Sequence, residues 1–560
     1  MVNRIKSAFF DIRVLFLGLA LVALFFFCVL PFFTLFERVL FPEGQFTLSL
    51  FEETFSSPAI TIAIKNTLLV SSLVTITCMF IAVPLAWLLT RTDFPAARKF
   101  RSLLCLPFAI PPYIGAIAWI YLANPTTGLL PHLVGGDLFN IYSFTGLVFV
   151  EASFLYTFIL LTTLSSLDRM DSSFEEAARL SGASPLRVFR DISLPLMRPS
   201  LISGGLLVFL ATAASFGVPA LIGGPARIYL MTTQIYTLQK MGSVSGILKA
   251  GALSSLLMVT ALLTIFLSQF ISRKAKFQTV SGKTSRPSVI ELGKWKPLAV
   301  IGVLTFGFIV FVLPISGILI SSLSKVQGDV GLSNFGFGNW YRVLFEVDET
   351  GRALFNSFIL SAGAATLAVI VGYLVSYVQT KTRLPGGHLF DVIASLPYAT
   401  PGTVVALALI MTFSGQLFGV LPSLYNTLGL ILIAYFVKYL SFAVKTSADG
   451  FRQVDDVLAE ASRVSGASWL QTMIRIWLPL LKPSLVAAWF LVFMPAMSEL
   501  TMTTLLTGPG LETIGTLIFQ LQEYADASGG GASVLALIVI IIVIAINYVV
   551  KRVSNGKYGL

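Results

Sequence analysis

About twelve apolar segments recur along this 560-residue chain, and they constrain its fold more than any other feature. Each is close to the ~20 residues that an α-helix needs to cross a bilayer. Because lipid offers the backbone no hydrogen-bond partners, the segments are predicted to be helices. Only 12% of the residues are charged, whereas a soluble domain carries about a quarter. The predicted fold class is therefore an all-α integral membrane protein, with spans at 14–36, 66–90, 103–123, 143–165, 200–221, 250–272, 297–323, 354–379, 390–413, 427–448, 484–506 and 531–550.

The distribution of basic residues predicts the orientation of these spans. Lys and Arg gather in the segments 91–101, 169–198 and 273–296, whereas the loops 124–142, 414–426 and 507–530 contain none. Cytoplasmic loops carry an excess of Lys and Arg, so the first set and both termini are predicted to be cytoplasmic. Topology thus accounts for the net charge of +11, and a nucleic-acid partner is not expected.

The chain contains an internal repeat. Asn66 recurs as Asn356, a shift of 290 residues (356−66), and Gly182 recurs as Gly466, a shift of 284 (466−182). Because each half has an even number of spans, both halves enter the membrane in the same direction, as parallel repeats. We predict a first six-helix repeat over 1–272, a basic cytosolic linker over 273–296 and a second six-helix repeat over 297–560.

One polar cytosolic segment appears in each repeat, at 172–195 and at 455–479. In the first, Ser172 and Glu175 have the spacing of a capping box, which predicts a helix start. Gly182 is expected to break this helix, and Ser184 followed by Pro185 to begin a second short one that ends before Leu194–Pro195. A loop without a docking role has little reason to repeat its glycine and proline, so we interpret both segments as docking elements.

Several chemistries are excluded by the residues themselves. The segment "SGKTS" at 281–285 resembles the end of a phosphate-binding loop, but the required first glycine would stand at position 277, which is Phe277. Two histidines and three widely spaced cysteines make a histidine-based metal site or a redox pair improbable. The chain is therefore not expected to be an enzyme, and any ATP chemistry must come from a partner.

The two polar segments share one pattern: a Glu-Ala pair followed by a small residue, then a glycine, then Ile-x-Leu-Pro. It comprises Glu176, Ala177, Ala178, Gly182, Ile192, Leu194 and Pro195 in the first copy, and Glu460, Ala461, Ser462, Gly466, Ile476, Leu478 and Pro479 in the second. This pattern resembles the EAA motif of ABC importer permeases, and its one departure is Ser462, where the motif has alanine.

The resemblance covers essentially the whole chain as two fused permease halves, and it implies the type I importer fold. In that family each EAA segment is a coupling helix seated in an ATPase subunit, so two ATPase copies are expected, with ATP and Mg²⁺ bound by them and no cofactor on this chain. The resemblance also implies an extracytoplasmic substrate-binding protein and a place in the bacterial inner membrane, in contact with lipid. Alternating access driven by the ATPases would move the substrate.

The substrate is suggested by two further segments. Residues 215–236 and 498–526 resemble the ferric-iron importer family, whose members include fused double permeases of this length. Thiamine, 2-aminoethylphosphonate and polyamine permeases share the broader architecture and stay open as alternatives. An ion-coupled secondary carrier is a more remote alternative, against which the paired EAA segments argue.

Three ionisable residues fall inside predicted spans: Glu151, Lys438 and Glu499. Such residues cost ~2.5–3.5 kcal/mol on insertion scales and indicate a functional site by default. A hard trivalent cation prefers oxygen ligands, so Glu499 is predicted to line the pathway and to meet Fe(III) in transit. Glu151 is a second pathway candidate, but it aligns within about one helical turn of Lys438 across the repeat. A buried Glu151–Lys438 ion pair with a purely structural role is the alternative.

Prolines stand at matching places in the two repeats. Pro107 and Pro111 in the first correspond to Pro397 and Pro401 in the second. Simple kinks at helix ends would explain them. Discontinuous helices beside a translocation site are the second interpretation.

Overall fold

The computed structural model describes residues 12–42, 44–136, 139–275, 289–329, 331–382, 387–415, 422–524 and 530–553. These residues are almost entirely helical, with two isolated backbone bridges, Thr92 to Ile290 and Ser324 to Phe335. Among them, ten helices are long and apolar enough to cross a membrane, and two sharply bent helix pairs raise the number to twelve if each pair is one span. The predicted membrane fold is confirmed. Most of the predicted linker, residues 276–288, lies outside the described residues.

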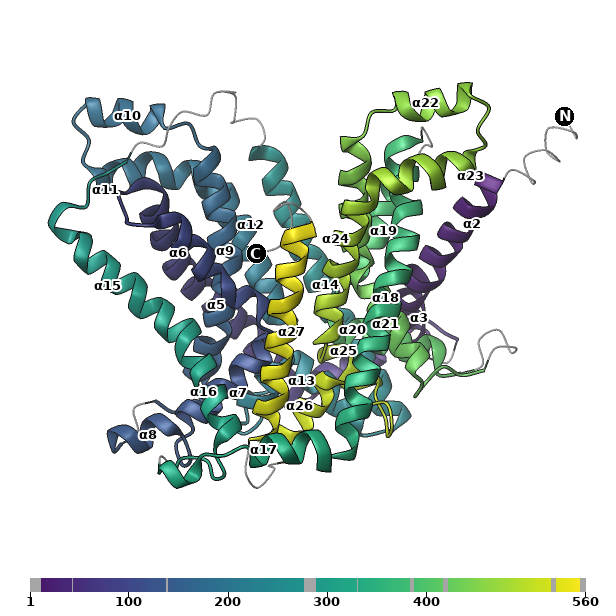
Figure 1. Ribbon diagram of the computed structural model, residues 1–560. Coiled ribbons are helices and arrows are strands. Elements are labelled where there is room, and N and C mark those ends of the chain that lie inside the picture. Colours follow the sequence, from purple (N-terminus) through teal and green to yellow (C-terminus); the bar gives the residue numbers. More distant parts are fainter. Residues whose placement is uncertain are drawn as a thin grey trace, which may run out of the picture.

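The helices before residue 276 form the first half (Figure 1). Their bounds are α2 Ile12–Leu24, η1 Phe25–Val29, α3 Leu30–Leu40, α4 Ser49–Ser56, α5 Pro58–Arg91, α6 Ala97–Cys105, η2 Leu106–Ala109, α7 Pro112–Ala123, α8 Leu129–Val134, α9 Phe144–Arg169, α10 Ser173–Leu180, α11 Pro185–Val188, η3 Phe189–Ser193, α12 Leu194–Ala213, η4 Pro219–Gly223, α13 Met231–Lys240 and α14 Val244–Ala275.

The second half repeats this order after residue 289. Its bounds are η6 Gly293–Trp295, α15 Lys296–Gly307, η7 Phe308–Val312, α16 Leu313–Leu323, η8 Leu332–Asn334, α17 Gly338–Tyr341, η9 Arg342–Glu346, α18 Asp348–Lys381, α19 Gly387–Ala399, α20 Gly402–Phe413, α21 Leu428–Gln453, α22 Val457–Val464, α23 Trp469–Thr472, η10 Met473–Trp477, α24 Leu478–Met497, α25 Thr501–Leu506, α26 Ile514–Glu523 and α27 Gly531–Val553.

Equivalent hydrogen bonds show that the repeat is structural. Asn66 Nδ2 donates to the carbonyl oxygen of Tyr229 at 3.1 Å, and Asn356 Nδ2 donates to that of Glu512 at 2.9 Å. One residue further on, the hydroxyl oxygens of Thr67 and Ser357 accept the first backbone N–H groups of α13 and α26, each at 2.8 Å. Each half therefore ties its long helix, α5 or α18, to the same outer turn by the same two contacts.

The repeated prolines break two spans. The chain turns by 91° between Ala97–Phe108 and Pro112–Ala123, and by 104° between Leu389–Ala399 and Gly402–Phe413. Pro111 and Pro401 stand at the breaks, with extended ψ angles of 129° and 140°. Proline lacks the N–H that would continue the helix, and its ring clashes with the preceding turn. Of the two interpretations, these sharp turns favour discontinuous helices over simple kinks, and a translocation site beside them stays a prediction.

Other prolines are absorbed without a break. A five-residue π-helical turn precedes the dipeptide Leu–Pro four times, at η1, η3, η7 and η10. A π turn shifts the hydrogen-bond register by one residue, which relieves the ring of its clash with the carbonyl four residues earlier. The expectation that Leu194–Pro195 ends the second short helix is therefore wrong, because α11, η3 and α12 run on as one helix, Pro185–Ala213.

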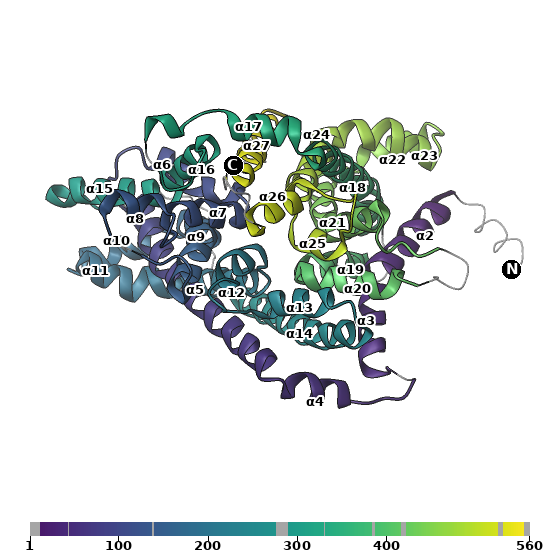
Figure 2. The ribbon, with the colours of Figure 1, turned by 90° about the horizontal axis from the view of Figure 1, so that it is seen from below.

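The first span of each half packs against the other half. Helices α2 and α3 contact α18, α19 and α20, and α16 contacts α7. Figures 1 and 2 agree in placing purple α2 beside the green helices of the second half and teal α15 beside α6 of the first. The halves also meet where α13 contacts α20 and α25. Most of the buried apolar residues of the two halves form one continuous cluster.

Candidate functional site

The two polar segments lie at one end of the molecule, as separate projections (Figure 1). Each consists of a short helix, α10 or α22, a glycine bend and a second helix that continues into the membrane span. Gly182 and Gly466 have φ angles of +84° and +83°, which glycine adopts at little cost. Ser184 and Ser468 accept hydrogen bonds from the backbone N–H groups of Arg187 and Gln471. The helix, bend and second helix start predicted for the first copy are confirmed, and the second copy has the same arrangement.

A buried ion pair holds the first segment to the membrane domain. Arg91 Nε, at the end of α5, lies 2.8 Å from Glu175 Oε2, and each side chain is 2% exposed. Ser193 Oγ donates to Glu175 Oε1 at 2.6 Å, and Arg91 Nη2 donates to the Leu167 carbonyl at 2.9 Å. Glu175 thus does not complete the capping box predicted from its spacing, because its carboxylate joins α5, α10 and η3 instead.

The second segment uses aromatic packing at the equivalent positions. Ala459 and Trp477 replace Glu175 and Ser193 at the shift of 284 residues. Lys381, at the position of Arg91, has its Nζ atom 4.8 Å from the centre of the Trp477 ring and pairs with Asp456. A cation over an aromatic face is attractive. The two segments are therefore anchored at the same place by different chemistry.

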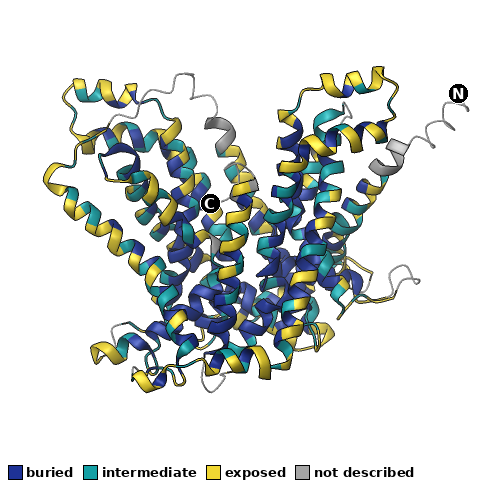
Figure 3. Ribbon diagram, viewed as in Figure 1, coloured by how far each residue is buried: buried dark blue, intermediate teal, exposed yellow. Residues whose placement is uncertain are grey.

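Figure 3 shows exposed residues at the tips of both segments, and apolar residues are among them. Leu180 is 91% exposed and its counterpart Val464 is 90% exposed. The motif residues Glu176, Ala177, Glu460 and Ala461 are exposed beside them. Ser462, the departure from the motif, forms a hydrogen bond of 3.0 Å with Thr472 and so links α22 to α23. Rigid, repeated and apolar tips are suited to a protein partner.

The remaining motif residues lie where the second helix continues into the span. Ile192 and Ile476 belong to the π turns η3 and η10. Leu194–Pro195 and Leu478–Pro479 follow at the starts of α12 and α24. Ala178 is half-buried on the short helix α10. The motif therefore covers both the exposed tip and its connection to the membrane.

Glu499 lies in a break between helices rather than inside the predicted span 484–506. It follows α24, and its carboxylate caps α25 by accepting the backbone N–H of Met502 at 2.9 Å and that of Thr503 at 3.0 Å. The Thr503 hydroxyl donates to it at 2.7 Å, and the Tyr435 hydroxyl is 2.7 Å from that of Thr503. Backbone N–H groups at a helix start stabilise a negative charge, which accounts for its burial here.

Glu151 and Lys438 do not form the predicted ion pair. Lys438 Nζ donates to the carbonyl oxygens of Pro397, Tyr398 and Thr400, at the broken span. The Glu151 carboxyl oxygens are buried, and among the described residues neither has a hydrogen-bond partner. The lysine instead binds carbonyl groups at the end of the broken helix, where the regular backbone hydrogen bonds stop.

The two buried glutamates occupy non-equivalent positions of a contact that recurs in the two halves. Helices α9 and α21 begin 284 residues apart (428−144), so Glu151 is equivalent to Tyr435. Ser215 is equivalent to Glu499 and also stands in a break, between α12 and η4. Ser215 lies close to Glu151, and in the other half the Thr503 hydroxyl links Glu499 to Tyr435. Each half thus carries one carboxyl group at this contact, on the long helix in the first half and in the break in the second.

Three phenol groups lie near Glu499. Tyr113, Tyr435 and Tyr439 are all within range of its charge. Tyr113 comes from the first half, and its buried hydroxyl has no hydrogen-bond partner among the described residues. Sequence reasoning found Glu499 by its charge but did not assign these phenols, because aromatic residues are common in membrane proteins.

Comparison with known proteins supports the architecture described above. Residues 71–276 and 364–555 each match the family described as binding-protein-dependent transport system inner membrane component. A putative ferric transport system permease protein, FbpB 1 of Haemophilus influenzae, is 28% identical over 85% of this chain and 75% of its own length. The ferric transport system permease protein FbpB of Actinobacillus pleuropneumoniae is 26% identical over 96% of this chain and 73% of its own.

A solved structure is also similar. It is a bacterial alginate ABC transporter in complex with an alginate pentasaccharide-bound periplasmic protein, 17% identical to this chain. The match covers 48% of this chain and 96% of the other, with a TM-score of 0.37.

Proposed function

Because the chain belongs to the family of binding-protein-dependent transport system inner membrane components, we propose that it forms the membrane pathway of an ATP-driven importer of ferric iron. The observation that carries this proposal is the pair of exposed polar segments at 172–195 and 455–479, here called the coupling segments, on a chain with two matching halves. The relatives named as ferric transport permeases, which match across nearly the whole chain, favour iron as the substrate.

Each coupling segment would bind one ATPase subunit. Leu180 and Val464 would enter apolar hollows in the two ATPases, and the buried anchor of each segment would transmit their movement to the spans. ATP and Mg²⁺ would be held by those subunits, so this chain would carry out no hydrolysis itself. The coupling end and both termini would then face the cytoplasm of a bacterial inner membrane.

Alternating access follows from how the halves meet. The coupling segments stand apart, whereas the halves join where α13 contacts α20 and α25 (Figures 1 and 2). Closure of two ATPases would bring the coupling segments together and open the opposite end. An extracytoplasmic binding protein would deliver the substrate there.

The central oxygen cluster supports iron as the cargo. Glu499 and the phenols of Tyr113, Tyr435 and Tyr439 come from both halves, as expected for groups beside a shared pathway. Hard cations bind carboxylate and phenolate oxygens in preference to softer ligands. We propose that Glu499 meets Fe(III) in transit while its bonds to α25 keep it in place.

The experiment is ATP-dependent uptake into proteoliposomes that contain this chain, its ATPase and its binding protein. Fe(III), thiamine, 2-aminoethylphosphonate and a polyamine are offered separately, with a hydrolysis-deficient ATPase as the control. We expect uptake of Fe(III) alone, and none with the deficient ATPase. Uptake of another substrate instead would support the importer assignment but contradict iron as its substrate. Uptake without hydrolysis would indicate a secondary carrier.

A further inference from the structure

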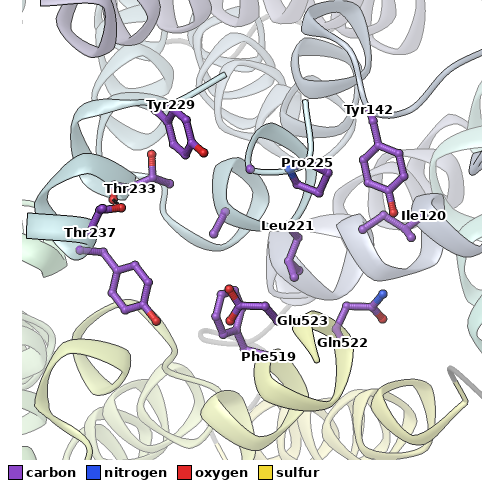
Figure 4. A pocket seen from close by; sticks show the side chains of 13 residues that line it. Ile120, Tyr142, Leu221, Pro225, Tyr229, Thr233, Thr237, Phe519, Gln522 and Glu523 are labelled. Carbon is purple, nitrogen blue, oxygen red and sulfur yellow. Dashed lines mark hydrogen bonds between the residues drawn. The ribbon is translucent and has the colours of Figure 1, made fainter. Parts of the chain in front are cut away.

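A pocket lies between the two halves, toward the end opposite the coupling segments. It has a volume of about 460 Å³. The first half contributes Tyr229, Thr233 and Tyr236 from α13 and the loops around it. It also contributes Tyr142, which precedes α9. The α26 helix of the second half supplies Gln522 and Glu523 (Figure 4). The pocket is therefore formed only when the halves are together.

The polar lining consists of oxygen-rich groups. Three phenols, the carboxylate of Glu523, the amide of Gln522 and two threonine hydroxyls face a shared space, and no thiol or imidazole is among the lining residues. Figure 4 shows Tyr229 and Thr233 across the pocket from Glu523 and Gln522. Such a donor set favours a hard cation over a soft one. The volume exceeds that of a bare ion, so a hydrated or chelated ion fits.

The repeat identifies Glu523 as a feature of one half only. Helices α13 and α26 are related by a shift of 283 residues (514−231), which makes Lys240 the counterpart of Glu523 and Tyr236 the counterpart of Phe519. Lys240 Nζ lies 5.6 Å from the centre of the Tyr236 ring. One half thus contributes a cation and a phenol where the other contributes an anion and a phenyl ring.

Charges in this region act on one another. Partial burial raises the pKa of Glu523, and Lys240 opposes that shift. Burial raises the pKa of Tyr236 to about 12, and the charge of Glu523 adds to the effect. A trivalent cation would stabilise both the carboxylate and the phenolate far more strongly than Lys240 does, because the attraction grows with the charge of the ion. Binding to Tyr236 would release its phenol proton to water.

We propose that this pocket is the first coordination site for the trivalent cation on the permease, with Glu523 and Tyr236 as its principal ligands and Lys240 as a resident competitor. The inference rests on the proposed function, because it assigns the ferric ion's place of arrival. Helix α26, which lines the pocket, also contacts α25, the helix that Glu499 caps. Opening of the outer end would separate α13 from α26 and admit the ion from the binding protein.

The test uses Tb³⁺, a hard trivalent probe whose emission is sensitised by nearby tyrosine. The full chain in lipid nanodiscs is titrated with Tb³⁺ as wild type, Glu523→Gln, Tyr236→Phe and Lys240→Gln. Loss of a ligand is expected to weaken binding by at least about tenfold in the first two variants. Removal of the competing ammonium in Lys240→Gln is expected to tighten it. Glu53→Gln, at an exposed carboxylate paired with Lys249, is the matched control and should leave binding unchanged.

Fe(III) uptake with the complete transporter separates this inference from the proposed function. Tyr236→Phe introduces the side chain that the other half already has, so it should fold normally. If wild type imports Fe(III) while Glu523→Gln and Tyr236→Phe bind Tb³⁺ and import Fe(III) as wild type does, the pocket assignment fails and the function stands. If wild type imports no Fe(III), the function and the inference fail together.

Discussion

Arg91 Nε lies 2.8 Å from Glu175 Oε2 in an environment where both side chains are 2% exposed, and this contact joins the end of the long helix α5 to the first coupling segment. The equivalent positions in the second half hold Lys381 and Ala459. The second segment packs an aromatic cluster around Trp469 and Trp477, whereas the first combines this ion pair with the ring contact of Trp87 and Phe189.

The Glu175→Gln variant should destabilise the first coupling segment. Removal of one member of a buried ion pair leaves an uncompensated charge, which costs about 3–5 kcal/mol. We expect a lower thermal midpoint in detergent and faster hydrogen exchange in α10. Asp456→Asn, at the exposed member of the corresponding pair with Lys381, is the control and should change both little. Equal effects of the two substitutions would contradict the difference in anchoring.

Leu180→Asp and Val464→Asp should each weaken binding of one ATPase. Both side chains are exposed, so the substitutions should leave the fold intact while they place a charge against an apolar contact. The number of ATPase subunits retained per chain, measured by native mass spectrometry, is expected to fall from two to one for each single variant. Leu133→Asp, on exposed α8 away from the coupling segments, is the control. Retention of two ATPases by both variants would disprove the assigned contact.

Glu499→Gln should stop Fe(III) uptake while ATP hydrolysis stimulated by the binding protein persists. The amide oxygen still accepts one of the N–H groups of α25, so the cap is weakened rather than abolished, but the negative charge in the pathway is lost. Uptake and hydrolysis are measured on the same proteoliposomes. Uptake at the wild-type rate by this variant would show that the Glu499 carboxylate acts only as a helix cap.

Asn356→Ala should destabilise the outer turn of the second half. Its Nδ2 group donates to the Glu512 carbonyl, and such a hydrogen bond contributes about 1 kcal/mol. Asn66→Ala, which removes the equivalent bond to Tyr229, should have a smaller effect because Asn66 is more exposed than the buried Asn356. Thermal midpoints of the two variants measure the difference. The reverse order would show that burial does not set the strength of these bonds.

The segment after residue 289 should loosen in acid. Asp93 accepts the backbone N–H of Leu292 and pairs with Lys296, and these contacts hold the pKa of Asp93 below its usual value. A lowered pKa gives stabilisation that is present above the ordinary carboxyl pKa of about 3.9 and is lost as the pH falls below it. Hydrogen exchange at Leu292 should therefore rise in that range. Asp93→Asn should remove the pH dependence, and its persistence would assign the change to another group.

Local rules predicted the elements that local forces control. Hydropathy located the spans, because each helix satisfies its own backbone in lipid. The glycines at 182 and 466 marked the bends, since only a residue without a side chain adopts a φ near +83° freely. The same rules placed Pro111 and Pro401 at the broken spans. They failed at Leu194–Pro195, where a π turn lets the helix continue.

Side-chain partners were not predictable in the same way. The charges of Glu151 and Lys438 indicated a pair by register, but Lys438 binds the carbonyl groups exposed by the broken span 390–413. Glu175 had the spacing of a capping residue, but Arg91, 84 positions earlier, takes its carboxylate (175−91). In both cases the actual partner is a group that the sequence pattern did not single out, because the packing of whole helices decides which atoms lie within reach.

The sequence by itself determined that this chain is a membrane protein of two related halves, each with one polar segment made of a helix, a glycine bend and a second helix. Hydrophobic length and the geometry of glycine and proline act within short stretches, and the repeat shows that these stretches occur twice. The tertiary structure decided which atoms meet across the halves. The swapped first spans, the phenols around Glu499 and the pocket that joins Tyr236 to Glu523 arise from residues far apart in the chain. Their contacts depend on how whole helices pack, and packing is a property of the assembled surfaces rather than of any one segment.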